Sequence, residues 1–180
     1  MKIRAALVAA IAALLLTGCS STPAAESSPT ESAPTAVVSE DSTVAQWASL
    51  IARQKASWED WETGWNENSC SGLVAGSESG FLCRVQMMSA MYQSQTTDIE
   101  YQLATGPGKK GFIAEQPPQE ISALFADTRQ AAVEARDAGA AWDAAGCSAT
   151  AAGDCGALAV TFDRAIGDLM SEFDAWGPYL

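Results

Sequence analysis

Residues 43–68 read TVAQWASLIARQKASWEDWETGWNEN, and this stretch decides the predicted fold. Its large residues recur at steps of three and four, which is the spacing of one face of an α-helix. Thr43 and Gln46 have the spacing of a capping box, in which two side chains satisfy free backbone N–H groups of the first turn. The stretch therefore predicts an amphipathic helix from Thr43 to about Asn68. The positions on its recurring face are Val44, Trp47, Ile51, Gln54, Trp58, Trp61 and Trp65.

A second helix is predicted over about residues 80–105, because the same period continues there. Gly106-Pro107-Gly108 ends it, since this triplet cannot continue a helix. We expect its heptad face to be the one that packs in the core. The positions on that face are Phe81, Val85, Met88, Tyr92, Gln95, Ile99 and Leu103.

Two further helices complete the pattern. The third is expected to start at Pro117-Pro118 and to end at Gly146, because proline is tolerated in a first turn. Many residues of its apolar face are alanine, which would let a neighbouring helix approach closely. The fourth is expected to begin at an N-cap Asp154 and to end before Gly177-Pro178. Its apolar face consists of Leu158, Phe162, Ile166, Leu169, Phe173 and Trp176.

These segments predict an all-α protein, since none shows the strict alternation typical of a strand. Helices of about 24 residues are roughly 36 Å long. Short connections between helices of matched length favour antiparallel neighbours. We therefore expect residues 43–180 to form an up-down four-helix bundle made of two αα-hairpins, with less regular hairpin stacking as the alternative. This topology would place the first and third loops together at one end, which we call the distal end.

The first 42 residues have a different composition. Residues 1–18 have a basic start, an apolar run from Ala5 to Leu16 and small residues at its end, as in a secretory signal peptide. Residues 19–42 are rich in Ser, Thr, Pro and Ala, which predicts a disordered tether. The sequence Leu16-Thr17-Gly18-Cys19 resembles the lipobox of bacterial lipoproteins. The resemblance implies cleavage before Cys19, a diacylglycerol on its sulfur, and anchoring at the extracytoplasmic face of a cell membrane.

The chain has five cysteines, and a lipid on Cys19 would leave an even number for an oxidising compartment. Three pairings of these four are possible. We favour Cys70–Cys83 and Cys147–Cys155, because each bond would close one loop between two predicted helices. Metal binding is the weaker reading, since the spacings differ from those of zinc sites and the chain has no histidine.

Composition argues against several kinds of chemistry. Lys and Arg total 10 against 22 Asp and Glu, so we expect no nucleic acid partner. Without histidine there is no base for a Ser-His-Asp or Cys-His mechanism. Residues 72–77, GLVAGS, lack the lysine of a phosphate-binding loop and are interpreted as a flexible turn. We expect no catalytic residue, no metal and no cofactor, and hence no enzyme.

The predicted function is therefore binding. The leading hypothesis is a membrane-anchored interaction module that contacts another envelope or exported protein through its distal end. The alternative is a carrier of a sugar, peptide or amine, with a tryptophan-lined groove between helices. Most of the six tryptophans fit core positions. Trp65 and Trp142 lie near the distal end and are the two that we expect to contact a partner or ligand.

Overall fold

The computed structural model describes residues 42–180; the predicted signal peptide, Cys19 and almost all of the predicted tether lie outside the described residues. Four long α-helices and one short one form this part of the chain, and it contains no strand. Within it, no helix is both long enough and apolar enough to cross a membrane. The helices are α1 (Val44–Glu67), α2 (Gly72–Ala75), α3 (Phe81–Thr105), α4 (Ser122–Ala144) and α5 (Cys155–Ala175), with 3₁₀ turns at Gln119–Ile121 and Gly177–Tyr179.

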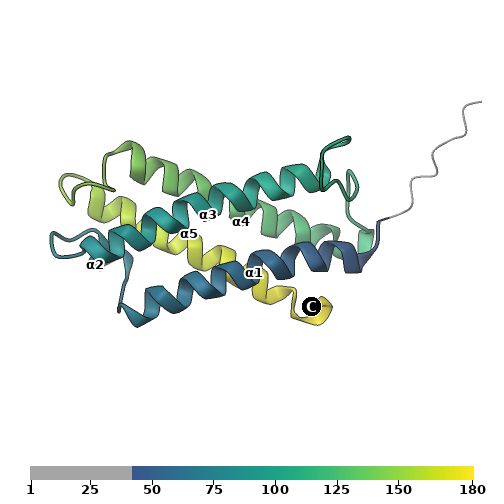
Figure 1. Ribbon diagram of the computed structural model, residues 1–180, viewed down its shortest axis with the longest axis horizontal. Coiled ribbons are helices and arrows are strands. Elements are labelled where there is room, and N and C mark those ends of the chain that lie inside the picture. The colour runs from purple at the N-terminus through teal and green to yellow at the C-terminus, as the bar shows by residue number, and fades with distance from the viewer. Residues whose placement is uncertain (1–41) are drawn as a thin grey trace, which may run out of the picture. The chain divides into compact units, whose positions relative to one another are not determined.

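The long helices run alternately up and down, as the sequence predicts (Figure 1). The α1–α3 and α4–α5 connections lie at one end, and the start of α1, the α3–α4 loop and the C-terminus lie at the other. Both disulfides join the favoured pairs, Cys70–Cys83 and Cys147–Cys155. The predicted all-α bundle with two loop disulfides is confirmed.

Helix α1 buries the face that its spacing predicts. Its capping box is present, with Thr43 and Gln46 bonded reciprocally. The polar break in its heptad face, Gln54, is buried and accepts a 2.9 Å hydrogen bond from the Thr97 hydroxyl. That hydroxyl also accepts a 3.1 Å bond from the Trp58 indole N–H. The three side chains satisfy one another, which fixes how α1 lies against α3.

Helix α3 buries a different face from the one that we expected. Phe81, Val85, Tyr92 and Ile99, which the heptad spacing assigned to the core, are exposed. The buried face is a mixture of sulfur-containing, small and polar residues: Cys83, Arg84, Met87, Ala90, Met91, Ser94, Thr97, Asp98, Tyr101 and Ala104. Small residues let α4 approach, and the buried Asp98 is ion-paired with Arg136 of α4 and accepts a 2.8 Å bond from Gln102. The prediction was wrong because it weighed side-chain size and not the partners of polar groups.

Helices α4 and α5 pack closely through small residues, as the alanine content of α4 predicts. A Cβ on Gly139 of α4 would lie only 2.8 Å from the Phe162 ring of α5. At the other end, the Trp176 N–H donates a 2.9 Å bond to the buried Thr128 hydroxyl. Asp154 stands at the N-cap of α5 as predicted, but its side chain makes no capping bond.

Candidate protein-interaction surface

The short helix α2, which the sequence analysis interpreted as a flexible turn, is fixed at both ends. At its start, the Ser71 hydroxyl accepts a 3.2 Å bond from the Val74 N–H. The Gly72 N–H donates a 2.8 Å bond to Asp163 of α5. A carboxylate at a helix start is also favoured by the positive end of the helix dipole. These bonds tie α2 to a helix that lies about 90 residues later in the chain.

Two glycines, the first residue of α2 and its C-cap, let the backbone of α2 rest on α5. A Cβ on Gly72 would lie 2.7 Å from the Val160 Cα atom, and one on Gly76 would lie 2.5 Å from the Gly156 Cα atom. Real Cβ atoms do not approach carbon this closely, so any side chain at either position would push the two segments apart. The glycines that suggested flexibility therefore serve close packing.

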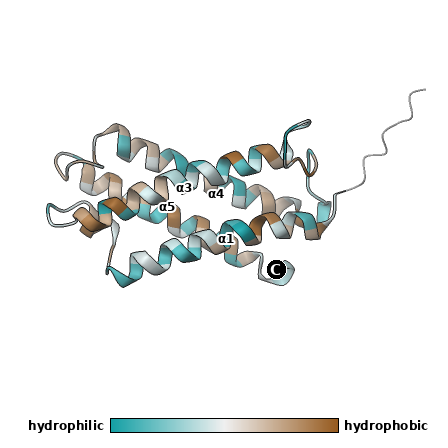
Figure 2. Ribbon diagram, in the orientation of Figure 1, coloured by the Kyte–Doolittle hydropathy of each residue, from teal (hydrophilic) through white to brown (hydrophobic). Residues whose placement is uncertain are grey.

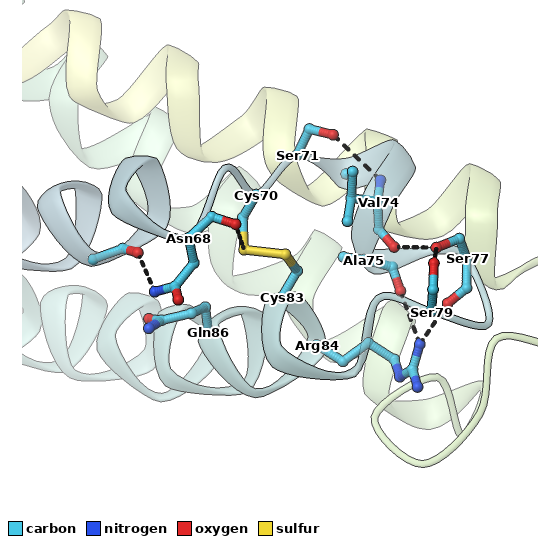
Figure 3. Close-up of a disulfide and its surroundings, with 12 residues drawn as sticks. Asn68, Cys70, Ser71, Val74, Ala75, Ser77, Ser79, Cys83, Arg84 and Gln86 are labelled. Atoms are coloured by element: carbon cyan, nitrogen blue, oxygen red, sulfur yellow. Dashed lines mark hydrogen bonds between the residues drawn. A yellow bond between two sulfur atoms is a disulfide. The ribbon is translucent and has the colours of Figure 1, made fainter.

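The start of α3 holds α2 from the other side (Figure 3). The Cys70–Cys83 disulfide bridges the residues that precede α2 to the first turn of α3. The buried Arg84 guanidinium donates to the carbonyl oxygens of Ala75, at 3.3 Å, and Ser77, at 2.7 Å. Those oxygens lie at and just beyond the C-terminal end of α2, where a helix leaves carbonyl groups without a partner. Arg84 thus ties the C-terminal end of α2 to the first turn of α3.

This rigid corner presents large apolar side chains to solvent. Four of them, which we call the distal patch, are exposed by 76% (Leu73), 39% (Val74), 63% (Phe81) and 64% (Leu82). In Figure 2, α2 is coloured as strongly hydrophobic although it lies at the tip of the bundle. Monomeric proteins rarely leave apolar groups clustered in this way without a function.

A second apolar feature continues along α3. Phe81, Val85, Tyr92 and Ile99 are exposed and Met88 and Leu103 are partly exposed; we call these six residues the outer stripe. None of them is charged. Among all the residues of α3 that are not buried, Glu100 is the only charged one. The solvent sides of α1, α4 and α5 by contrast carry several Asp, Glu and Arg residues each.

The two tryptophans selected from the sequence both lie in the core. Trp142 is fully buried, and its indole N–H has no hydrogen-bond partner. Trp65 is 7% exposed and stacks on Trp61, with ring centroids 5.1 Å apart. The edges of Trp61 and Trp65 line a pocket of about 340 Å³ between α1 and α5, which does not include Trp142. Neither residue belongs to the distal patch. The patch was not predicted from the sequence, because Phe81 was assigned to the core and residues 72–77, which include Leu73 and Val74, were interpreted as a flexible turn.

Two ionisable groups of the described region show how their surroundings shift a pKa. The pKa of Lys55 is raised, chiefly by its hydrogen bond to Asp174, so this ammonium ties α1 to α5. Burial raises the pKa of the Tyr101 phenol, whose oxygen has no hydrogen-bond partner. Between residues 42 and 180, no three Cys, Asp or Glu side chains come together as a metal site would require. The arrangement that stands out is therefore an apolar surface on a rigid support.

Compared with models of protein families, with curated proteins and with solved structures, the chain matches none of them.

Proposed function

We propose that this chain is a lipid-anchored interaction module at the extracytoplasmic face of a cell membrane, and that its distal patch binds an envelope or exported protein. One observation carries the proposal. Helix α2 is fixed by a disulfide, a carboxylate cap, two glycine contacts and a buried arginine, yet its own large side chains, Leu73 and Val74, face solvent. A corner built only for stability would turn such residues inward.

Rigidity at the patch favours binding. Association costs free energy when flexible side chains and loops become ordered, and a surface that is already ordered avoids most of this cost. The distal patch contains one aromatic and three aliphatic residues without a charge among them. Charged residues are depleted and aromatic residues enriched at the centres of protein interfaces. The chemistry of the patch therefore suits an apolar protein surface better than a polar small molecule.

The anchoring part of the proposal is supported by the cysteines and the N-terminal motif. All four cysteines between residues 42 and 180 are paired with one another. Cys19 is then the one cysteine of the chain outside these pairs, and it stands at the last position of the lipobox-like sequence. Replacing Cys19→Ser in the full chain should abolish incorporation of labelled palmitate and release the protein from the membrane fraction. Retention in the membrane without palmitate would contradict lipid anchoring.

The binding part is tested by exchanging one patch residue. Affinity capture from native cells, with mild crosslinking and the full chain as bait, should yield a stoichiometric partner that is lost with Leu82→Ser. The control is Phe112→Ser, which removes another exposed large apolar side chain (41% exposed, against 64% for Leu82) from the α3–α4 loop at the opposite end of the bundle. Both variants should keep the unfolding temperature of the wild type. Equal loss of capture in both variants would refute a role for the distal patch.

A small-ligand carrier remains the second candidate, because the Trp61 and Trp65 edges meet the surface in the pocket beside α5. Two of its three acidic side chains are already engaged, since Asp163 accepts from Gly72 and Asp174 pairs with Lys55. Tryptophan emission should therefore stay unchanged when choline or a simple sugar is added to the full chain. A saturable shift that disappears with Trp65→Phe would favour the carrier instead.

A further inference from the structure

The outer stripe of α3 has a symmetry of its own. Val85 and Ile99 lie seven residues before and after Tyr92, and Phe81 and Leu103 lie eleven residues before and after it. Five of the six positions of the outer stripe are therefore arranged as a palindrome about Tyr92; the sixth, Met88, lies opposite Thr96. Seven residues are close to two helical turns and eleven are close to three, so all five share one face of the helix.

Such a palindrome is what an antiparallel pair of identical helices requires. When a helix packs against a reversed copy of itself about a two-fold axis, residues equally far from the centre meet, and the same patch is used on both copies. Here Tyr92 would meet Tyr92 on the axis, Val85 would meet Ile99, and Phe81 would meet Leu103. We propose that two copies of this chain pair through the outer stripe of α3, antiparallel, about an axis at Tyr92.

Charge favours this face over any other for self-association. The chain has a net charge of −12, so two copies repel each other at most approaches. The outer sides of α1, α4 and α5 carry acidic residues, such as Asp60, Asp127 and Asp168, that would meet their own copies. The outer stripe carries none, and Glu100 lies to one side of it. A second copy can therefore approach α3 with the least electrostatic cost.

The size of the stripe sets the strength of the dimer. Helix α3 has 25 residues and is about 37 Å long. Large apolar side chains exposed over that length would bury on the order of 600 Å² per copy, near the lower limit for a specific interface. The dimer is weak in dilute solution and becomes populated when both copies are held in one membrane, which raises their effective concentration. This last step rests on the anchoring in the proposed function.

The antiparallel arrangement is compatible with two anchored chains. It directs the two starts of α1 to opposite ends of the pair. Residues 20–42 could extend over roughly 70 Å if stretched, about twice the length of α3, so both lipids could reach the same membrane. Phe81 belongs to both surfaces and would be covered in the pair, whereas Leu73, Val74 and Leu82 of the distal patch stay outside the paired stripe and remain available to a different protein.

Cysteine crosslinking of the full chain in membranes tests the axis. In the Tyr92→Cys variant, residue 92 of one copy should form a disulfide with residue 92 of the other under mild oxidation, because the two sulfurs would meet on the axis. Thr161→Cys, exposed on the outer side of α5, should not. The wild type treated in the same way controls for the native cysteines.

The register is tested by mixing two variants. Val85→Cys and Ile99→Cys should crosslink with each other when co-expressed. Neither should crosslink when expressed alone, because two copies of residue 85 would lie about 21 Å apart along the pair. Self-linking of Val85→Cys with no 85–99 product would overturn the antiparallel arrangement.

A charge placed on the axis gives an independent measurement. In detergent, the full chain should sediment as a concentration-dependent dimer, and Tyr92→Glu should weaken it at least tenfold, whereas Thr161→Glu should leave it unchanged. A monomer at 100 μM together with no Tyr92→Cys crosslink in membranes would overturn the proposal.

The dimer and the proposed function can fail separately. If no dimer formed but partner capture still depended on Leu82, the interaction function would stand without the dimer. If the dimer formed and no partner depended on Leu82, the dimer would stand and the proposed partner surface would fail.

Discussion

Helices α1 and α3 resemble each other in sequence pattern and differ in how they use it. Both have large residues at steps of three and four over more than twenty residues. Helix α1 buries this face, including Trp47, Trp58 and Trp61, whereas α3 exposes most of it, including Val85, Tyr92 and Ile99. The period is the same, so something other than the period decides which side is buried.

The opposite sides of the two helices explain the difference. The side of α1 away from its tryptophans carries Glu59, Asp60 and Glu62, which could not be buried without partners. The corresponding side of α3 has only two charged residues, and both have partners: Arg84 bonds two carbonyl oxygens and Asp98 pairs with Arg136. Helix α3 thus has two faces that can be covered, and it offers the core the one with small residues.

The largest expected effect is on the free energy of unfolding, which should respond very differently to substitutions in the buried face of α1 and in the outer stripe of α3. Trp58→Ala removes a fully buried indole and its bond to Thr97, and should destabilise the fold by about 3–5 kcal/mol. Tyr92→Ala removes a ring that is 59% exposed and should change stability by no more than about 0.5 kcal/mol at low protein concentration. Urea unfolding followed by circular dichroism measures both. Comparable losses in the two variants would mean that the outer stripe is also part of the monomer core.

An intermediate effect distinguishes the two disulfides that flank these helices. The bonds close loops of similar length, with separations of 13 and 8 residues, so replacing either pair by serine should cost on the order of 3 kcal/mol. Only loss of Cys70–Cys83 should also abolish partner capture, because this bond holds α2 and the distal patch. If both double variants kept full capture at a temperature where they remain folded, α2 would not need its clamp.

The smallest effect concerns the inner face of α3. Burial raises the pKa of the Tyr101 phenol, so it stays protonated in the folded protein above pH 10, where an unfolded tyrosine ionises. Its contribution to stability is therefore complete below about pH 10 and declines as the pH rises further. Tyr101→Phe should flatten that decline. Because the phenol oxygen lacks a partner, the variant should be as stable as the wild type at pH 7, or more stable by up to about 1 kcal/mol. A steeper alkaline decline in Tyr101→Phe would contradict this assignment.

The fold was predictable wherever the sequence offered both a period and a clear end. Thr43 with Gln46 marked the start of α1, Gly106-Pro107-Gly108 marked the end of α3, and loop cysteines pointed to their own pairing. Spacing could not show that Thr97 would satisfy Gln54, or that Arg136 would neutralise Asp98. These partners come from other helices, and without them the buried side of α3 looked like its solvent side.

The candidate site was less predictable, because each residue type that forms it is compatible with two different structural roles. Gly72 and Gly76 have the composition of a flexible loop, and only the position of α5 shows that they permit close packing. Exposure of Leu73 and Leu82 cannot be read from their identity, since leucine is more often buried than exposed. Trp65 and Trp142 were predicted to contact a partner or ligand, but their large apolar rings are buried in the core.

The even number of long helices has a practical consequence for anyone who labels this protein. Because the chain returns to the end of the bundle where α1 begins, a fluorescent protein or epitope fused after Leu180 would emerge at that end. There it would compete for space with whatever precedes α1. The loop at residues 148–153, mostly exposed and at the opposite end, is the better insertion point, since a reporter there would emerge at the outer tip.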